Sequence, residues 1–139
     1  DIGLADPQAL VLANTGFDVI HKIGMPEARI VLAEVCIYLA LAEKSNTAYE
    51  AIGAAYRTLE QKGQAQVPPH LRDGTNKDLR GLKQPYKYPH AFPGAFVSQQ
   101  YLPDAYRDIE FYKPNHRGVE DTLVRQWMKR RQQDEDDTE

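Results

Sequence analysis

Residues 30–41 are Ile-Val-Leu-Ala-Glu-Val-Cys-Ile-Tyr-Leu-Ala-Leu, a run in which apolar side chains occupy almost every position. A helix formed by such a run presents apolar groups on all sides, which is typical of a helix that other elements cover on all sides. The chain of 139 residues is long enough for one domain with its own hydrophobic core. We therefore expect a helix here that forms the core of the domain or of an oligomer, with Cys36 buried and inert.

Start and stop signals predict a helix on each side of this run. Asp6 before Pro7 is an N-cap followed by proline at the first helical position, and the apolar stripe behind it ends at Gly24. A third helix is predicted between the capping residue Ser45 and Gly63. The stripe of the first helix consists of Leu10, Ala13, Phe17 and Ile20.

A fourth helix is predicted over residues 119–132, because Val119, Leu123 and Trp127 recur at helical spacing and are expected to face inward. Residues 134–139 are five acids and a threonine, a composition typical of a disordered tail. The predicted fold class is all-α, with about four main helices in one helical domain over residues 1–133 and a disordered acidic tail over 134–139.

Residues 67–103, called the excursion below, have neither helical nor strand periodicity and are rich in proline, tyrosine, histidine and arginine. Loops longer than about 12–15 residues are uncommon in compact domains unless they serve a function. We expect the excursion to be ordered and to form the functional surface of the domain. The sequence around it also allows a short helix over 77–82 and a small β-hairpin that pairs 95–100 with 109–112.

Composition excludes several classes of protein. The formal net charge is −3, but residues 57–90 carry seven basic and three acidic side chains, so the middle of the chain is basic. One cysteine cannot form a disulfide within the chain, which favours a reducing, intracellular setting. No apolar run approaches the roughly 18–20 residues that span a bilayer, and the start Asp1-Ile2-Gly3 lacks an initiating Met and a signal-peptide pattern. We expect a piece of a longer, non-membrane protein.

The candidate chemical motifs are few. His70, Asp73 and His90 would suit zinc, but their spacing matches no strong metal signature. The alternative is that His70 packs and hydrogen-bonds within the excursion, while Arg72 and Asp73 bond to the backbone and hold it. Neither a paired nucleophile nor a Gly-x-x-x-x-Gly-Lys-Ser/Thr loop is present, so no catalytic residue, cofactor site or metal site is predicted, and we expect no ATP binding by this chain alone.

Basic and aromatic residues interleave in the excursion. Cations that bind phosphates and rings that stack on bases are the ingredients of a nucleic-acid surface. The alternative is that the charges are solvated and the rings half-buried, because the local excess of charge is modest. The residues concerned are Lys77, Arg80, Lys83, Tyr86, Lys87 and Tyr88.

Seven short motifs, taken in order, resemble the C-terminal region of the replication-associated recombination protein A family, also called RarA or MgsA, whose eukaryotic relative is the Werner helicase-interacting protein. The resemblance covers the chain to about Gly118. The motifs are Asp1-Ile2-Gly3-Leu4-Ala5-Asp6-Pro7, Ile23-Gly24-Met25-Pro26-Glu27, Tyr38-Leu39-Ala40, Lys44-Ser45-Asn46, His70-Leu71-Arg72-Asp73, Tyr86-Lys87-Tyr88-Pro89-His90 and Gln99-Gln100-Tyr101-Leu102-Pro103.

This resemblance implies a clamp-loader-like AAA+ ATPase whose P-loop core and lid precede residue 1, with ATP and Mg bound there, and whose C-terminal helical domain makes a homotetramer. It further implies a cytoplasmic, nucleoid-associated protein that acts on DNA at stalled forks, with DNA-stimulated ATP hydrolysis and a link to single-strand-binding protein. The main hypothesis is therefore a tetramerisation domain, and the candidate oligomer interface consists of Ile30, Ala33, Ile37, Leu41, Ile52 and Ala55.

Two other hypotheses stay open. One is a DNA- or protein-binding module of the same ATPase that uses the basic Tyr/Lys-rich loop 72–88. The other is a small metal-dependent enzyme built on the two histidines and the aspartate named above. The candidate functional surface consists of His70, Arg72, Asp73, Lys83, Tyr86, Lys87, Tyr88, His90, Gln100 and Tyr101.

Overall fold

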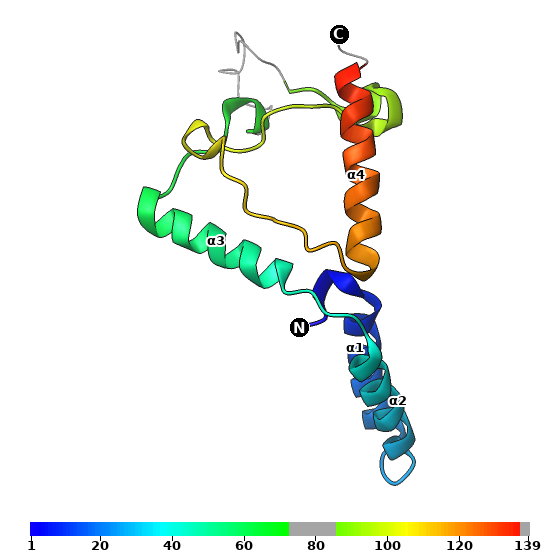
Figure 1. Cartoon of the computed structure of the whole chain (residues 1–139). Coiled ribbons are helices and arrows are strands. Elements are labelled where there is room, and N and C mark those ends of the chain that lie inside the picture. Colours follow the sequence, from blue (N-terminus) through cyan, green and yellow to red (C-terminus); the bar gives the residue numbers. More distant parts are fainter. Residues whose placement is uncertain (73–85, 137–139) are drawn as a thin grey trace. The chain divides into compact units, whose positions relative to one another are not determined.

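The computed structural model describes residues 1–72 and 86–136, with side chains to residue 133. Within these ranges it contains α1 Gln8–Ile23, α2 Ala28–Leu41, α3 Thr47–Lys62 and α4 Gly118–Asp136 (Figure 1). Short 3-10 turns are η1 Gly3–Ala5, η2 Pro69–Leu71, η4 Pro89–Ala91, η5 Pro93–Ala95 and η6 Asp104–Tyr106. No strand occurs in the described ranges, which confirms the all-α prediction.

The chain divides into two compact units. Unit 1 comprises Asp1–Gly53 and Phe111–Arg125, and unit 2 comprises Ala54–Glu110 and Gln126–Glu139. Unit 1 therefore contains α1 and α2, and unit 2 contains the excursion. None of the helices in the described residues combines the length and the apolar content needed to cross a bilayer.

In unit 1, α1 and α2 pack against each other as a helical hairpin (Figure 1). Gly24 has a φ of +68° and its N–H donates to the Ile20 carbonyl at 2.9 Å, so the glycine ends α1 as predicted. Gly16 is buried at the contact, where a Cβ would come within 2.7 Å of Cγ2 of Val35. The two helices therefore approach closely through a small residue.

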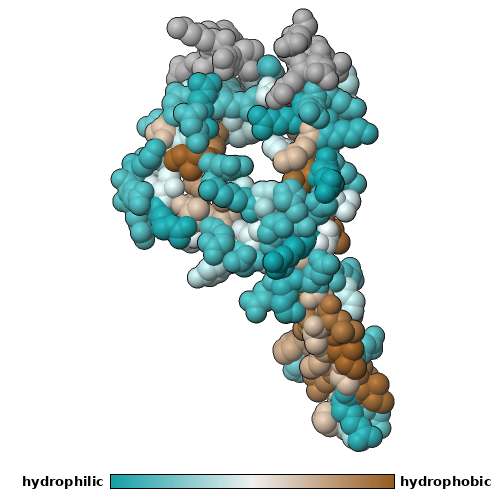
Figure 2. Space-filling model, in the orientation of Figure 1, coloured by the Kyte–Doolittle hydropathy of each residue, from teal (hydrophilic) through white to brown (hydrophobic). Residues whose placement is uncertain are grey.

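Most large apolar side chains of this hairpin are exposed in the single chain, so the domain itself does not cover residues 30–41, and of the two expected sources of cover only another subunit is left open. Exposure reaches 66% at Ile30, 61% at Ile37 and 80% at Leu41, and Ala28 is the buried residue of α2. Cys36 is exposed as well, so its predicted burial is wrong. The reason is that one antiparallel partner covers one side of a helix, whereas this sequence is apolar on all sides. Figure 2 shows the hydrophobic residues gathered over α1 and α2.

On α1, two residues of the predicted apolar stripe, Leu10 and Phe17, are also exposed. On α4 the predicted inward residues Val119, Leu123 and Trp127 are each 44–47% exposed. The Trp127 ring instead carries the Arg131 guanidinium 5.6 Å from its centroid.

α4 buries Val124 and a carboxylate, that of Glu120. Glu120 is 0% exposed, and its Oε2 accepts a hydrogen bond from Ser45 Oγ at 2.8 Å. Its Oε1 accepts from Thr47 Oγ1 and from Tyr112 Oη, each at 2.6 Å. Ser45 and Thr47 lie at the start of α3, so one side chain in the first turn of α4 joins the N-terminal ends of two helices. We call Glu120, Ser45, Thr47 and Tyr112 the carboxylate cluster.

The bounds of the elements differ from the predictions at three places. α3 begins and ends as expected, whereas α4 continues to Asp136, beyond its predicted end at 132 and into the segment predicted as a disordered tail. The β-hairpin over 95–100 and 109–112 is wrong, because neither segment forms a strand. Residues 137–139 and the predicted helix over 77–82 lie outside the described residues.

Gly118 fits only without a side chain. It has a φ of +53°, and a Cβ there would overlap the carbonyl oxygen of Ala5 in η1. We expect Gly118→Ala to lower the free energy of unfolding by about 2–3 kcal/mol, measured by urea denaturation. Gly94→Ala is the matched control, because Gly94 also has a positive φ but no atom within 4 Å of a Cβ. Its cost should be the backbone cost alone, about 1 kcal/mol. Equal costs for the two variants would contradict the predicted clash.

Candidate functional site

In unit 2, the three motifs that lie in the excursion converge on residues 99–101. In chain order they begin at His70, Tyr86 and Gln99. His70 Nε2 lies 2.7 Å from the Gln100 carbonyl oxygen. Because a carbonyl only accepts, Nε2 of His70 carries a proton and donates this bond. The first motif is therefore tied to the third by a histidine that bonds within the excursion, as one of the two sequence interpretations expected.

The second motif is tied to the third by a side-chain amide. Gln99 Nε2 donates to the Lys87 carbonyl at 2.9 Å, and Gln99 Oε1 accepts from the Lys87 N–H at 3.1 Å. This pair of bonds satisfies both backbone groups of Lys87 as a neighbouring strand would, although no strand is present in the described residues. Lys87 Nζ also donates to the Ser98 carbonyl at 3.3 Å.

Arg72 holds the start of the excursion. Its Nε donates to the Val67 carbonyl at 2.9 Å, and its Nη2 donates to Gln66 Oε1 at 2.9 Å. The prediction that His70 and Arg72 make local bonds is thus confirmed. Asp73 and Lys83 of the predicted functional surface, with Lys77 and Arg80 of the basic loop, lie outside the described residues.

The convergence leaves an aromatic surface open. Tyr86, Tyr88 and Tyr101 are 49%, 60% and 55% exposed. The Tyr88 ring lies 5.2 Å from the exposed His90 ring, centroid to centroid, and Tyr101 Oη accepts from Gln99 Nε2 at 3.1 Å. Exposed rings, of which one is held by a hydrogen bond and one by a ring contact, suit binding by stacking.

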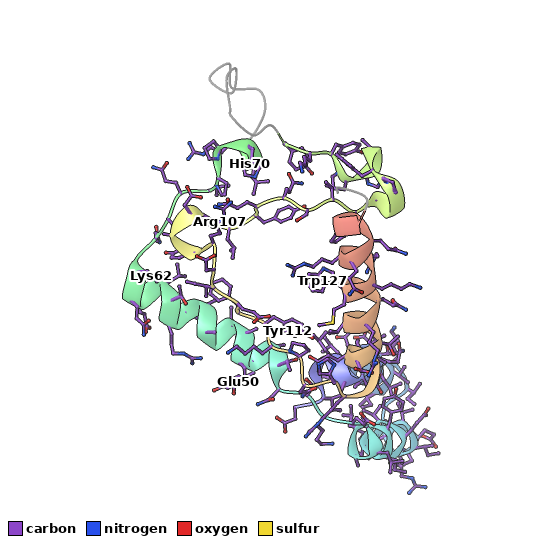
Figure 3. All side chains as sticks on the ribbon, turned by 45° about the horizontal axis from the view of Figure 1, so that its top comes forward. Glu50, Lys62, His70, Arg107, Tyr112 and Trp127 are labelled. Atoms are coloured by element: carbon purple, nitrogen blue, oxygen red, sulfur yellow. The ribbon has the colours of Figure 1, made fainter. Side chains whose placement is uncertain are left out.

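A cavity of about 620 Å³ lies between η2 and η6. Its lining includes His70, Arg72 and Gln100 of the predicted surface, together with Arg107, which follows η6. Figure 3 shows the labelled His70 and Arg107 close together at this end of unit 2. Sequence reasoning missed Arg107, because a lone arginine carries no signal before the contacts are known. It placed Gln99 in a motif of the excursion but not among the residues of the candidate functional surface.

The metal hypothesis finds no support in the described residues, where no three His, Cys, Asp or Glu side chains gather to hold an ion. Nε2 of His70 is occupied by the Gln100 carbonyl, and His90 packs beside Tyr88. Asp73, the third proposed ligand, lies outside the described part of the chain.

The predicted oligomer interface falls mostly on the hairpin of unit 1. Four of its residues are exposed on α2, namely Ile30, Ala33, Ile37 and Leu41. Ile52 is exposed in the first half of α3, whereas Ala55 is half-buried and belongs to unit 2. The structure therefore groups the α2 residues on one exposed helix.

Gln99 makes a testable contribution to the order of the tyrosine motif. We expect Gln99→Ala to raise the hydrogen-exchange rate of the Lys87 amide about five- to tenfold, because one hydrogen bond of about 1 kcal/mol is lost. NMR-detected exchange measures this rate. Gln100→Ala is the matched control, because the Gln100 side chain bonds to Leu102 and Asp104 instead. An unchanged Lys87 rate in Gln99→Ala would refute the clamp.

Comparison with known proteins gives one family. The family described as MgsA AAA+ ATPase C terminal matches residues 1–131. A replication-associated recombination protein A of Bacillus subtilis is 39% identical over 128 residues, which are 91% of this chain and 30% of that protein.

Two further relatives widen the range of organisms. An AAA domain-containing protein of Mycobacterium tuberculosis is 43% identical over 86% of this chain and 27% of its own length. The ATPase WRNIP1 of Dictyostelium discoideum is 36% identical over 81% of this chain and 13% of its own length. The chain thus spans less than a third of the length of these relatives.

Proposed function

The chain belongs to the MgsA AAA+ ATPase C-terminal family, and we propose that it is the tetramerisation domain of a clamp-loader-like ATPase that acts at stalled replication forks. Bacterial relatives are named replication-associated recombination protein A, and this name supports a role in replication-associated recombination. In this proposal ATP and Mg bind to a portion of the parent protein outside these residues. DNA and single-strand-binding protein are the proposed partners, and the cytoplasm, in association with the nucleoid, is the proposed location.

One observation carries the proposal: the α1–α2 hairpin exposes large apolar side chains on both of its helices. Single exposed apolar residues are ordinary on protein surfaces, but a contiguous group is typical of an interface. The most exposed of them are Leu10, Phe17, Met25, Ile30, Ile37 and Leu41.

A groove beside α1 extends this apolar surface. It encloses about 600 Å³ and is lined in large part by apolar residues, among them Ile2, Leu4 and Leu39. Leu10 and Ala13 line it as well, and Leu10 is also one of the exposed hairpin residues. A second copy of the hairpin supplies the apolar helix that such a groove accepts, which supports self-association.

Light scattering of the chain over about 1–100 µM tests the proposal. We expect a mass near four times 15.8 kDa. A chain that stays monomeric at the highest concentration would move the tetramer contacts to the rest of the parent protein.

A second candidate function rests on unit 2. The converged motifs hold Tyr86, Tyr88 and Tyr101 exposed beside Lys87, which supports a nucleic-acid-binding or protein-binding module. Binding of a fluorescein-labelled oligothymidylate, followed by anisotropy, tests it. Loss of affinity in Tyr88→Ala would support the module, and unchanged affinity would remove the tyrosines from it.

A further inference from the structure

We propose that the cavity between η2 and η6 is a phosphate pocket, which holds one phosphate group of a single-stranded nucleic acid whose bases stack on the exposed tyrosines of unit 2. The inference rests on the second candidate function and adds to it a defined subsite. Its basis is the chemistry of the residues that line the cavity.

The cavity is larger than one phosphate group and has room for part of the attached nucleotide. Its volume of about 620 Å³ lies in the range of small-ligand pockets. Pro68, Pro69 and Pro103 form part of the lining. Prolines have a fixed φ and no N–H, so these walls are stiff and offer no donor. Polar contacts to a ligand must therefore come mainly from the charged and amide side chains.

Arg72 is oriented before any ligand arrives. Its bonds to the Val67 carbonyl and to Gln66 use two of the five N–H donors of the guanidinium. Within residues 1–72 and 86–133, the other three donors have no partner and can bind an anion. A planar guanidinium with free paired donors matches two oxygens of a phosphate, and its fixed position removes part of the entropy cost of binding.

Arg107 supplies a second cation. Within residues 1–72 and 86–133, no hydrogen bond or ion pair involves its side chain, which is exposed. Among the described residues of the lining, Asp104 is the one acid, and its Oδ1 accepts from the Gln100 amide at 2.8 Å. The acid is thus held by a neutral partner, and two arginines against one carboxylate give this described part of the lining a net positive charge.

The surroundings favour a single strand over an acidic peptide. Gln100 lines the cavity, and its neighbours in sequence are Gln99, which clamps Lys87, and the exposed Tyr101. A cationic pocket followed by exposed rings matches the alternation of phosphate and base along a strand. An acidic peptide would match the pocket and leave the rings without a partner.

The experiment measures binding of the chain to a labelled oligothymidylate of about 15 nucleotides at several salt concentrations. For the double variant Arg72→Gln/Arg107→Gln we expect about tenfold weaker binding and a slope of log K against log salt that is shallower by about 0.7, the value for one phosphate of a single strand. The matched control is Arg57→Gln/Arg130→Gln, which removes the same charge from exposed positions of unit 2 outside the cavity. Its affinity should stay within about twofold of wild type.

The outcomes separate the pocket from the function on which it rests. If Tyr88→Ala weakens binding while the double variant behaves like its control, the pocket is refuted and the nucleic-acid module stands. If the wild-type chain does not bind the oligonucleotide, both the phosphate pocket and the nucleic-acid-binding module are refuted. If thymidine monophosphate displaces the labelled oligonucleotide as well as the unlabelled oligonucleotide does, the pocket does not recognise a strand. If an acidic peptide displaces it equally well, the assignment of the pocket to a nucleic acid is overturned.

Folding is checked by circular dichroism, because Arg72 also bonds to its own segment. Should Arg72→Gln lower the melting temperature, the single variant Arg107→Gln carries the test, since its side chain has no partner among the described residues. We expect it to weaken binding about threefold and to leave melting unchanged. Affinity equal to wild type in this folded variant would refute the pocket.

Discussion

Replacing Glu120 with alanine should lower the free energy of unfolding by about 3–5 kcal/mol, measured by urea denaturation. The carboxylate is fully buried and accepts hydrogen bonds from three hydroxyl groups. The variant leaves those donors without their acceptor, and each buried unsatisfied group costs about 1–3 kcal/mol. It also opens a cavity where two helix ends meet. A loss of this size is a large part of the 5–15 kcal/mol that typically stabilises a domain.

Glu43→Ala is the matched control, because Glu43 is an exposed acid of the same unit. Its effect should stay within about 0.5 kcal/mol. Equal urea midpoints for the two variants would show that the carboxylate cluster does not hold unit 1 together.

The same cluster makes stability depend on pH. Burial alone would raise the pKa of Glu120, but hydrogen bonds from Thr47, Tyr112, Ser45 and the Asn115 backbone outweigh it and hold the pKa below its usual value. Burial and the bond to Glu120 raise the pKa of Tyr112 to about 12, so its hydroxyl remains a donor at neutral pH. A lowered carboxyl pKa contributes stability above the unfolded pKa of about 4.3, and this contribution is lost as pH falls through the folded pKa. The difference in the free energy of unfolding between wild type and Glu120→Ala, measured by urea denaturation at several pH values, should therefore become smaller in acid.

The C-terminal end of α1 and both ends of α3 were predictable because they depend on local signals. Gly24 and Gly63 both have the positive φ that ends a helix, and the Ser45 hydroxyl accepts from the Thr47 N–H at 3.4 Å. The partners of Glu120 were not predictable, because Ser45 and Thr47 are 75 and 73 residues away in the chain. A buried glutamate in the first turn of a helix has the same sequence pattern as an exposed one.

In the excursion, too, some features were predictable from the sequence and others were not. Its composition indicated a functional surface, and the bonds of His70 and Arg72 agree with the local interpretation. The β-hairpin over 95–100 and 109–112 is wrong, and apolar alternation alone does not tell whether a segment pairs with a neighbouring strand. For residues 30–41 the sequence predicted the helix but left the source of its cover open, because a run that is apolar on all sides has the same pattern whether its cover comes from its own domain or from another subunit.

Whether another subunit covers α2 can be tested by a substitution on its surface, for which we expect a large change in the mass of the oligomer and none in the stability of the single chain. We expect Ile37→Arg to convert the proposed tetramer into a folded monomer or dimer, measured by light scattering. Ile37 is 61% exposed in the single chain, so an arginine there stays in water and should leave the melting temperature of the free chain unchanged. In an obligate interface, which should bury on the order of 2,000 Å² or more, the same arginine would be a buried unpaired charge. Its cost of several kcal/mol exceeds what one isoleucine contributes by burial, about 1.5–3 kcal/mol.

The comparison variant is Met128→Arg, which places the same charge on α4 at a residue that is 49% exposed. It should keep the wild-type mass, because the proposed interface lies on the α1–α2 hairpin. A lower mass in both variants would indicate a general effect of added charge. A tetramer that persists in Ile37→Arg would show that this face of α2 is not the interface. The exposed apolar surface is attributed to assembly if the mass falls in Ile37→Arg but not in Met128→Arg, while the melting temperature of the released chain is unchanged. The same side chain would then be exposed in the single chain and buried in the oligomer.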